Sequence, residues 1–89
     1  ANWKIWRDDA VEQIKRQLPP FYVPISEPCN VRLAYVAGDR RRRDFPAIVD
    51  AIWHVLERAA VVRDDALLWV SESSRRFDKY APGVTITFL

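Results

Sequence analysis

Four consecutive arginines, Arg40 to Arg43, lie between Asp39 and Asp44 near the middle of an 89-residue chain. Four adjacent guanidinium groups repel one another, and a small core could not pair them all. The run therefore has to lie on the surface, in a connection between two regular elements. An anionic partner would accept such a surface, and nucleic acid is the commonest partner of that kind.

Carboxylates accompany this arginine run. Asp44 follows it directly, and the pair Asp64-Asp65 lies beyond the next amphipathic stretch. Acidic groups in a phosphate-binding site repel the phosphate unless a metal ion lies between them. The pattern therefore indicates a metal-assisted reaction on a phosphate group. A basic loop that docks an acidic protein is the alternative.

Composition limits the class of protein. Hydrophobic residues make up 49% of the chain, which favours a folded domain over disorder, and a net charge of +2 means that the basicity is local. The single Cys29 excludes an internal disulfide and a cysteine-based zinc site, and it fits a reducing compartment. No apolar run approaches the ~20 residues of a membrane span, and no signal peptide is visible. A chain that begins with Ala1 is expected to be a fragment or a shortened protein.

Apolar spacing predicts two helices. The first covers residues 3–18 and is ended by Pro19-Pro20. The second covers residues 45–60, with Asp44 as its N-cap and Pro46 in its first turn. The predicted apolar stripe of the first helix consists of Trp3, Trp6, Ala10, Ile14 and Leu18.

Alternating apolar residues predict three strands, residues 31–37, 67–73 and 84–89. Residues 21–28 predict an extended crossing segment without a ladder of its own, and residues 75–83 predict a polar loop. The predicted class is α/β (α+β), a small mixed β-sheet with two packed helices in the order helix-strand-helix-strand-strand.

The run from Asp39 to Asp44, the helix after it and the pair Asp64-Asp65 together resemble the RusA-type Holliday-junction resolvases, the crossover junction endodeoxyribonucleases. In that family an arginine-rich loop leads into an Asp-x-Asp-Asn motif at a helix start. A lysine follows along the helix, and an Asp-Asp pair follows the next turn. The match runs without a gap from Asp39 to about Trp69 and is looser elsewhere. Residues 1–89 are expected to form a single RusA-like domain without the family's N-terminal strand.

The resemblance implies a homodimeric, cytoplasmic endonuclease of bacterial or phage origin that binds four-way DNA junctions in recombination and repair and cuts them with Mg²⁺, or Mn²⁺ in its place. It assigns catalysis to Asp44 and Asp65. The metal would be held by Asp44, Asp64, Asp65 and Asp50. DNA would contact the residues Arg40, Arg41, Arg42, Arg43, Arg75, Arg76 and Lys79.

Three positions depart from the family motif. Pro46 replaces its second aspartate, Ala47 its asparagine and Asp50 its lysine. Asp50 could replace the lost carboxylate, although about 9 Å of helix axis separates it from Asp44. It could also repel the phosphate that a lysine would attract. A catalytically decayed domain that binds DNA, or serves as a scaffold, is therefore the alternative to an active nuclease.

Each candidate residue also has a structural explanation. Asp44 is a good N-cap in any protein, and Asp64-Asp65 could simply end a turn before a strand. His54 lies one helical turn after Asp50 and could join a metal site, although a solvated helix surface is favoured. The tryptophans Trp3, Trp6, Trp53 and Trp69 are expected in the core or a dimer interface, and Cys29 in the core.

Overall fold

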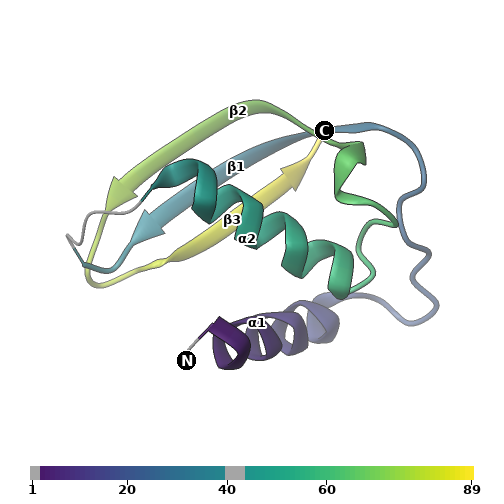
Figure 1. Cartoon of the computed structure of the whole chain (residues 1–89), viewed down its shortest axis with the longest axis horizontal. Helices are drawn as coiled ribbons and strands as arrows, with labels where there is room; N and C mark the ends of the chain where they lie inside the picture. The colour runs from purple at the N-terminus through teal and green to yellow at the C-terminus, as the bar shows by residue number, and fades with distance from the viewer. Residues whose placement is uncertain (1–2, 40–43) are drawn as a thin grey trace.

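The computed structural model describes residues 3–39 and 44–89 (Figure 1). The helices are α1 (Trp3–Gln17) and α2 (Phe45–Arg58), with a short 3₁₀ helix η1 (Asp65–Leu67), and the strands are β1 (Cys29–Ala37), β2 (Leu68–Phe77) and β3 (Gly83–Phe88). The predicted α+β class and its order of helices and strands are confirmed. Residues 40–43 lie outside the described residues.

The three strands form one mixed sheet in the order β2-β1-β3. β1 is the central strand, parallel to β2 and antiparallel to β3. Parallel neighbours need a crossover connection, and α2 supplies it between β1 and β2 (Figure 1). As a result α2 begins at the end of the sheet where β1 and β2 finish and β3 starts.

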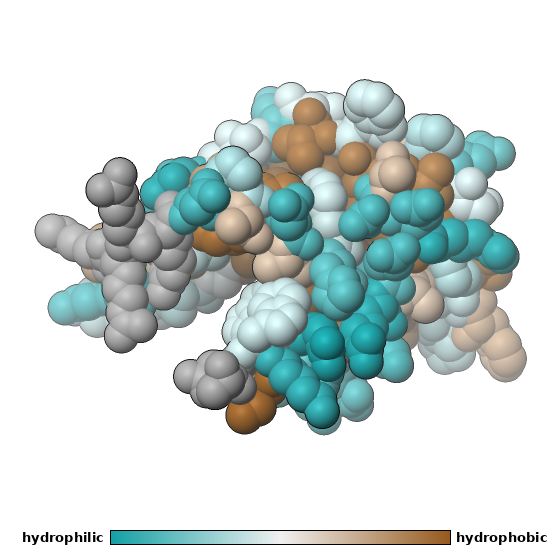
Figure 2. All heavy atoms as spheres, viewed as in Figure 1, coloured by the Kyte–Doolittle hydropathy of each residue, from teal (hydrophilic) through white to brown (hydrophobic). Residues whose placement is uncertain are grey.

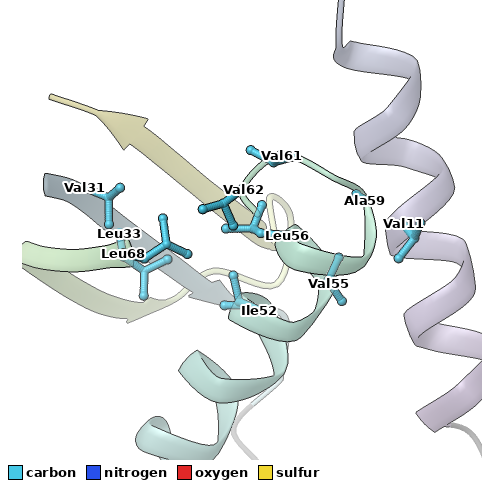
Figure 3. Close-up of a cluster of buried hydrophobic side chains, with 10 residues drawn as sticks. All are labelled: Val11, Val31, Leu33, Ile52, Val55, Leu56, Ala59, Val61, Val62 and Leu68. Carbon is cyan, nitrogen blue, oxygen red and sulfur yellow. The ribbon is translucent and has the colours of Figure 1, made fainter. Parts of the chain in front are cut away.

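The core lies between the sheet and the two helices (Figure 3). From β1, Val31 and Leu33 are fully buried, while Arg32 between them is exposed, because alternate residues of a strand face opposite sides. From α2, Ile52, Val55 and Leu56 enter the same cluster at helical spacing. The predicted apolar face of the second helix therefore packs on the sheet.

The first helix packs on the core through part of its predicted stripe, because Ala10, Ile14 and Leu18 lie partly buried against the cluster. Val11, which lies outside the predicted stripe, is its residue in the buried cluster. Trp3 and Trp6 stack on each other with ring centroids 5.3 Å apart, and each is 45% exposed. Hydrophilic residues cover the outward side of α1 (Figure 2). Trp3 and Trp6 are therefore outside the core of the single chain, and their predicted place in a dimer interface stays a prediction.

Strand β2 is longer than its sequence predicts. Residues 75–77, predicted as loop, continue the strand, and the ladder to β1 runs as far as Ala37 opposite Phe77. The nine-residue β1 offers backbone partners along its whole length, so polar side chains do not end the pairing. A register shift between Val31 and Arg32 also explains why the alternation in β2 is irregular.

The segment between α1 and β1 is tied to the turn after α2. Ile25 forms an isolated parallel bridge with Val62, and its N–H donates to the Val61 carbonyl at 3.0 Å. The Tyr22 hydroxyl donates to the same carbonyl at 2.8 Å. The segment was predicted to form no β-ladder. It forms one isolated bridge, so the prediction is wrong at Ile25. Across residues 3–39 and 44–89, neither helix has the length and apolar character needed to cross a membrane.

Candidate nucleic-acid interface

One end of the sheet gathers the predicted DNA-contacting residues that the structure describes, Arg75, Arg76 and Lys79. Ala37 pairs with Phe77, and Val36 pairs with Gly83, so β1 and β2 end where β3 begins. The chain leaves β1 toward Asp39 and returns at Asp44, the two residues that flank the arginine run. We call this region the basic end, defined by Arg75, Arg76, Lys79 and the flanks Asp39 and Asp44.

The start of α2 is fixed to the basic end by Phe45. Its ring lies 6.4 Å from the Tyr35 ring, centroid to centroid. The Arg75 guanidinium lies over the same ring, 5.6 Å from its centroid, in a cation–π contact. Arg76 follows on the opposite side of the strand. The two arginines predicted together in a loop are therefore strand residues that point to different faces of the sheet.

The turn between β2 and β3 belongs to the same region. The Asp78 backbone N–H donates to the Ala37 carbonyl at 2.9 Å, which ties the turn to the end of β1. The Asp78 carboxylate accepts from the Tyr80 N–H, also at 2.9 Å. The Tyr80 side chain is 85% exposed beside Lys79. Sequence reasoning missed Tyr80, although an aromatic residue next to a lysine in a polar stretch was a usable signal.

The arginines Arg40, Arg41, Arg42 and Arg43 lie outside the described residues. Their contacts with DNA stay a prediction. Their neighbours Asp39 and Asp44 are both exposed, and both lie at the basic end. The four positive charges are therefore carried by the connection that joins β1 to α2.

Asp44 occupies the predicted N-cap position of α2. Its backbone is extended, and its carbonyl accepts from the Ile48 N–H at 3.1 Å. Its carboxylate makes no capping hydrogen bond to the helix. The expected structural role of Asp44 is thus filled by its backbone and not by its side chain.

Asp64 and Asp65 lie beyond the other end of α2. Asp64 caps η1: its carboxylate accepts from the Ala66 N–H at 2.9 Å, and its carbonyl accepts from the Leu67 N–H at 3.1 Å. Asp65 is the first residue of η1 and is partly buried. These contacts show that Asp64 has a structural role in the turn that leads into β2.

The length of α2 separates the two groups of acids. Fourteen residues span about 21 Å of helix axis, whereas a carboxylate oxygen binds Mg²⁺ at about 2.1 Å. One ion therefore cannot contact both Asp44 and Asp65 of the same chain (Figure 1). Within a single chain this arrangement does not fit the metal set predicted from the family resemblance.

Asp50 and His54 do not complete a metal site on either side. Both are exposed on α2, and the His54 ring lies 6.0 Å from the Trp3 ring, centroid to centroid. Pro46 and Ala47 supply no side-chain ligand. In the part of the chain that the structure describes, no three histidine, cysteine, aspartate or glutamate residues are grouped as a metal ion would require.

A cleft of about 490 Å³ lies between α1, α2 and β3. Its wall is mostly apolar, with Ile14, Leu56 and Ile86 among the lining residues, and Asp9 is the titratable residue on it. None of the predicted catalytic or DNA-contacting residues lines it. The cleft therefore reaches the basic end at Gly83 without including its charged residues.

Comparison with known proteins identifies a distant relative of this chain. No protein-family model matches the chain. The chain is 26% identical over 89 residues to a protein named crossover junction endodeoxyribonuclease RusA, from Aquifex aeolicus (strain VF5). The match covers 97% of this chain and 64% of the relative's length. It supports a distant relationship to the RusA-type resolvases, in agreement with the resemblance seen in the motifs.

Proposed function

We propose that this chain binds branched DNA at its basic end, as a divergent relative of the RusA-type resolvases. The observation that carries the proposal is that Arg75, Arg76 and Lys79 lie at the same end of the sheet as both flanks of the arginine run, with the two arginines on its opposite faces. The N-terminus of α2 lies there too, and the partial positive charge of a helix N-terminus attracts phosphate.

Phosphate fits this surface better than the carboxylates of an acidic protein do. Guanidinium groups bind phosphate and carboxylate alike through paired hydrogen bonds, but the backbone of DNA offers a regular row of such anions. The net charge of only +2 makes a general attraction to anions weak, so the effect depends on the local cluster. The similarity to a protein named as a junction endodeoxyribonuclease also favours DNA.

Binding is tested by fluorescence anisotropy with a labelled four-way junction, across a range of salt concentrations. Replacing Arg75 and Arg76 by alanine is expected to weaken binding and to reduce the slope of log K against log salt by about 1.8, or 0.9 for each lost phosphate contact. The matched control replaces the exposed pair Lys15 and Arg16, in the last turn of α1. Equal weakening by both variants would mean that net charge, and not the basic end, drives binding.

The second candidate function is Mg²⁺-dependent cutting of junction DNA, with Mn²⁺ as the alternative ion. The name of the relative favours it. The acids would be Asp44 and Asp65, assisted by Asp64 and Asp50. Because α2 separates them within one chain, the proposal requires a homodimer in which the Asp44 end of one copy meets the Asp65 end of the other.

Cutting is measured on the same junction with Mg²⁺ or Mn²⁺, beside a chelator control and Asp65→Asn. Paired cuts that disappear in the variant and in chelator support an active nuclease. Unchanged binding without cuts, with metal or chelator alike, supports the non-enzymatic alternative, a DNA-binding or scaffold domain.

A further inference from the structure

Tyr80 is an aromatic side chain held out into solvent at the basic end. It is 85% exposed, whereas burying an aromatic ring is strongly favoured in water. The other highly exposed aromatics lie elsewhere: Phe21 between α1 and β1, and Trp69 at the start of β2. Tyr80 thus combines strong exposure with a position beside basic residues.

The turn that carries Tyr80 is fixed on both sides. Before it, Asp78 bonds through its N–H to Ala37 and through its carboxylate to the Tyr80 N–H. After it, Pro82 lies so close to Gly38 that a Cβ on this glycine would be 3.0 Å from the Pro82 Cβ. The turn that carries the exposed ring therefore contacts Ala37 and Gly38. These two residues directly precede Asp39, where the connection from β1 to α2 begins.

Lys79 adds a positive charge next to the ring. Its ammonium nitrogen lies 5.0 Å from the centroid of the Tyr80 ring. An aromatic face beside a cation is the combination with which proteins bind unpaired nucleotides, because the ring stacks on the base and the cation attracts the phosphate. Bases inside a duplex have both faces covered by their neighbours, so such a ring needs a base that is unstacked.

We propose that Tyr80 stacks on an unstacked nucleobase at the branch of a DNA junction, with Lys79 on the adjoining phosphate. The proposal rests on the proposed binding of DNA and deepens it, because it names the feature that distinguishes branched DNA from duplex. The arginines bind the backbone of either form. Tyr80 adds affinity where a base is free.

The test uses a four-way junction with the fluorescent base 2-aminopurine at the branch, and a duplex of the same arm sequence. Wild-type protein is expected to change the fluorescence at the branch, because stacking alters it. Tyr80→Ala is expected to abolish this change and to weaken junction binding by roughly 5- to 100-fold, while duplex binding changes less than about 2-fold. Tyr80→Phe retains the ring and is expected to behave like the wild type.

Phe21→Ala is the matched control, since it removes a 99% exposed aromatic from a segment far along the chain from the basic end. Circular dichroism verifies that each variant is folded. A Tyr80→Ala protein with wild-type junction-to-duplex preference and an unchanged fluorescence response overturns the role of Tyr80. A wild-type protein that binds neither DNA overturns the proposed function itself, so the two failures are distinguishable.

Discussion

Ala60 ends α2 in a backbone conformation that L-residues rarely adopt. Its φ is +59°, and its N–H donates to the Glu57 carbonyl at 3.0 Å, while the Val61 N–H donates to the Leu56 carbonyl. Glycine is the usual residue in such a helix ending because it has no Cβ to clash. The alanine keeps the turn but at a cost in strain, and this turn leads the chain into Asp64 and Asp65.

Ala60→Gly is expected to stabilise the protein by about 0.5–1 kcal/mol, because relief of the left-handed strain exceeds the added freedom of the unfolded chain. Thermal unfolding would show a rise in Tm of about 2–8 °C. Ala59→Gly is the control, since Ala59 is buried at a φ of −80° and gains nothing from glycine. Stabilisation by both changes would contradict the explanation.

Asp64 provides a second prediction at this scale. Its carboxylate caps η1 through the Ala66 N–H, so Asp64→Ala is expected to cost about 1 kcal/mol in the free energy of unfolding. Asp64→Asn keeps an acceptor oxygen and is expected to cost much less. Urea unfolding compares the two variants. An asparagine variant as unstable as the alanine variant would show that the charge, and not the cap, is what matters.

Among the secondary-structure elements, the segment between α1 and β1 depends on a few hydrogen bonds to the turn after α2. The Val61 carbonyl accepts from both the Ile25 N–H and the Tyr22 hydroxyl. Burial raises the pKa of Tyr22 above its usual value of 10.0, and the nearby Cys29 raises that pKa further. Both effects favour the neutral phenol that donates this bond.

Tyr22→Phe is expected to cost about 1 kcal/mol, because the Val61 carbonyl loses one donor but keeps the other. Since the pKa of Tyr22 is raised in the folded protein, its contribution is complete below about pH 10 and is lost as the pH rises through the folded pKa. Urea unfolding of both proteins at neutral and high pH provides the measurement. A wild-type advantage that grows at high pH would contradict this sign.

The elements differ in how well the sequence predicts them. The second helix was predictable because Ile52, Val55 and Leu56 recur at helical spacing after an N-cap residue and a first-turn proline, although it ends at Arg58 and not at residue 60. The continuation of β2 through Arg75 and Arg76 was not, because the length of a strand depends on its partner, and here β1 provides the partner. The burial of Val11, beside the predicted stripe of α1, depends on where α2 crosses the helix, which no local pattern contains.

The candidate site was also predictable only in part, because some of its geometry depends on how the elements pack. An arginine run between a strand and a helix must lie at the end of a sheet, and the sequence is sufficient for that. The distance between Asp44 and Asp65 is set by the length of α2 and by the side of the sheet to which it returns. The family resemblance implied one metal site, whereas the fold places Asp44 and Asp65 at opposite ends of α2.

At the scale of the whole molecule, the separated acids make a prediction about assembly. If two copies build each site, Asp44→Asn and Asp65→Asn are each inactive, yet an equal mixture of them regains cutting. Half of the dimers are then mixed, and one of their two sites is intact, so activity returns to about a quarter of the wild-type level. The measurement is the rate of junction cutting in Mg²⁺ after the two variants have been mixed and allowed to exchange.

The control for this experiment mixes Asp44→Asn with the double variant Asp44→Asn/Asp65→Asn, in which no intact site can form. Recovery in the first mixture alone supports a shared site. An active wild type whose two variants fail to complement each other would instead require the acids of one chain to come together, which this fold does not allow without rearrangement.

The central position of β1 also determines when the sheet can form during synthesis. β1 is made before both of its partners: Val31 pairs with Val70 on one side and with Phe88 on the other. A nascent chain on the ribosome therefore exposes both edges of its most buried strand until α2 and β2 have emerged. Chaperones that shield extended apolar segments would have their longest opportunity to bind during this interval.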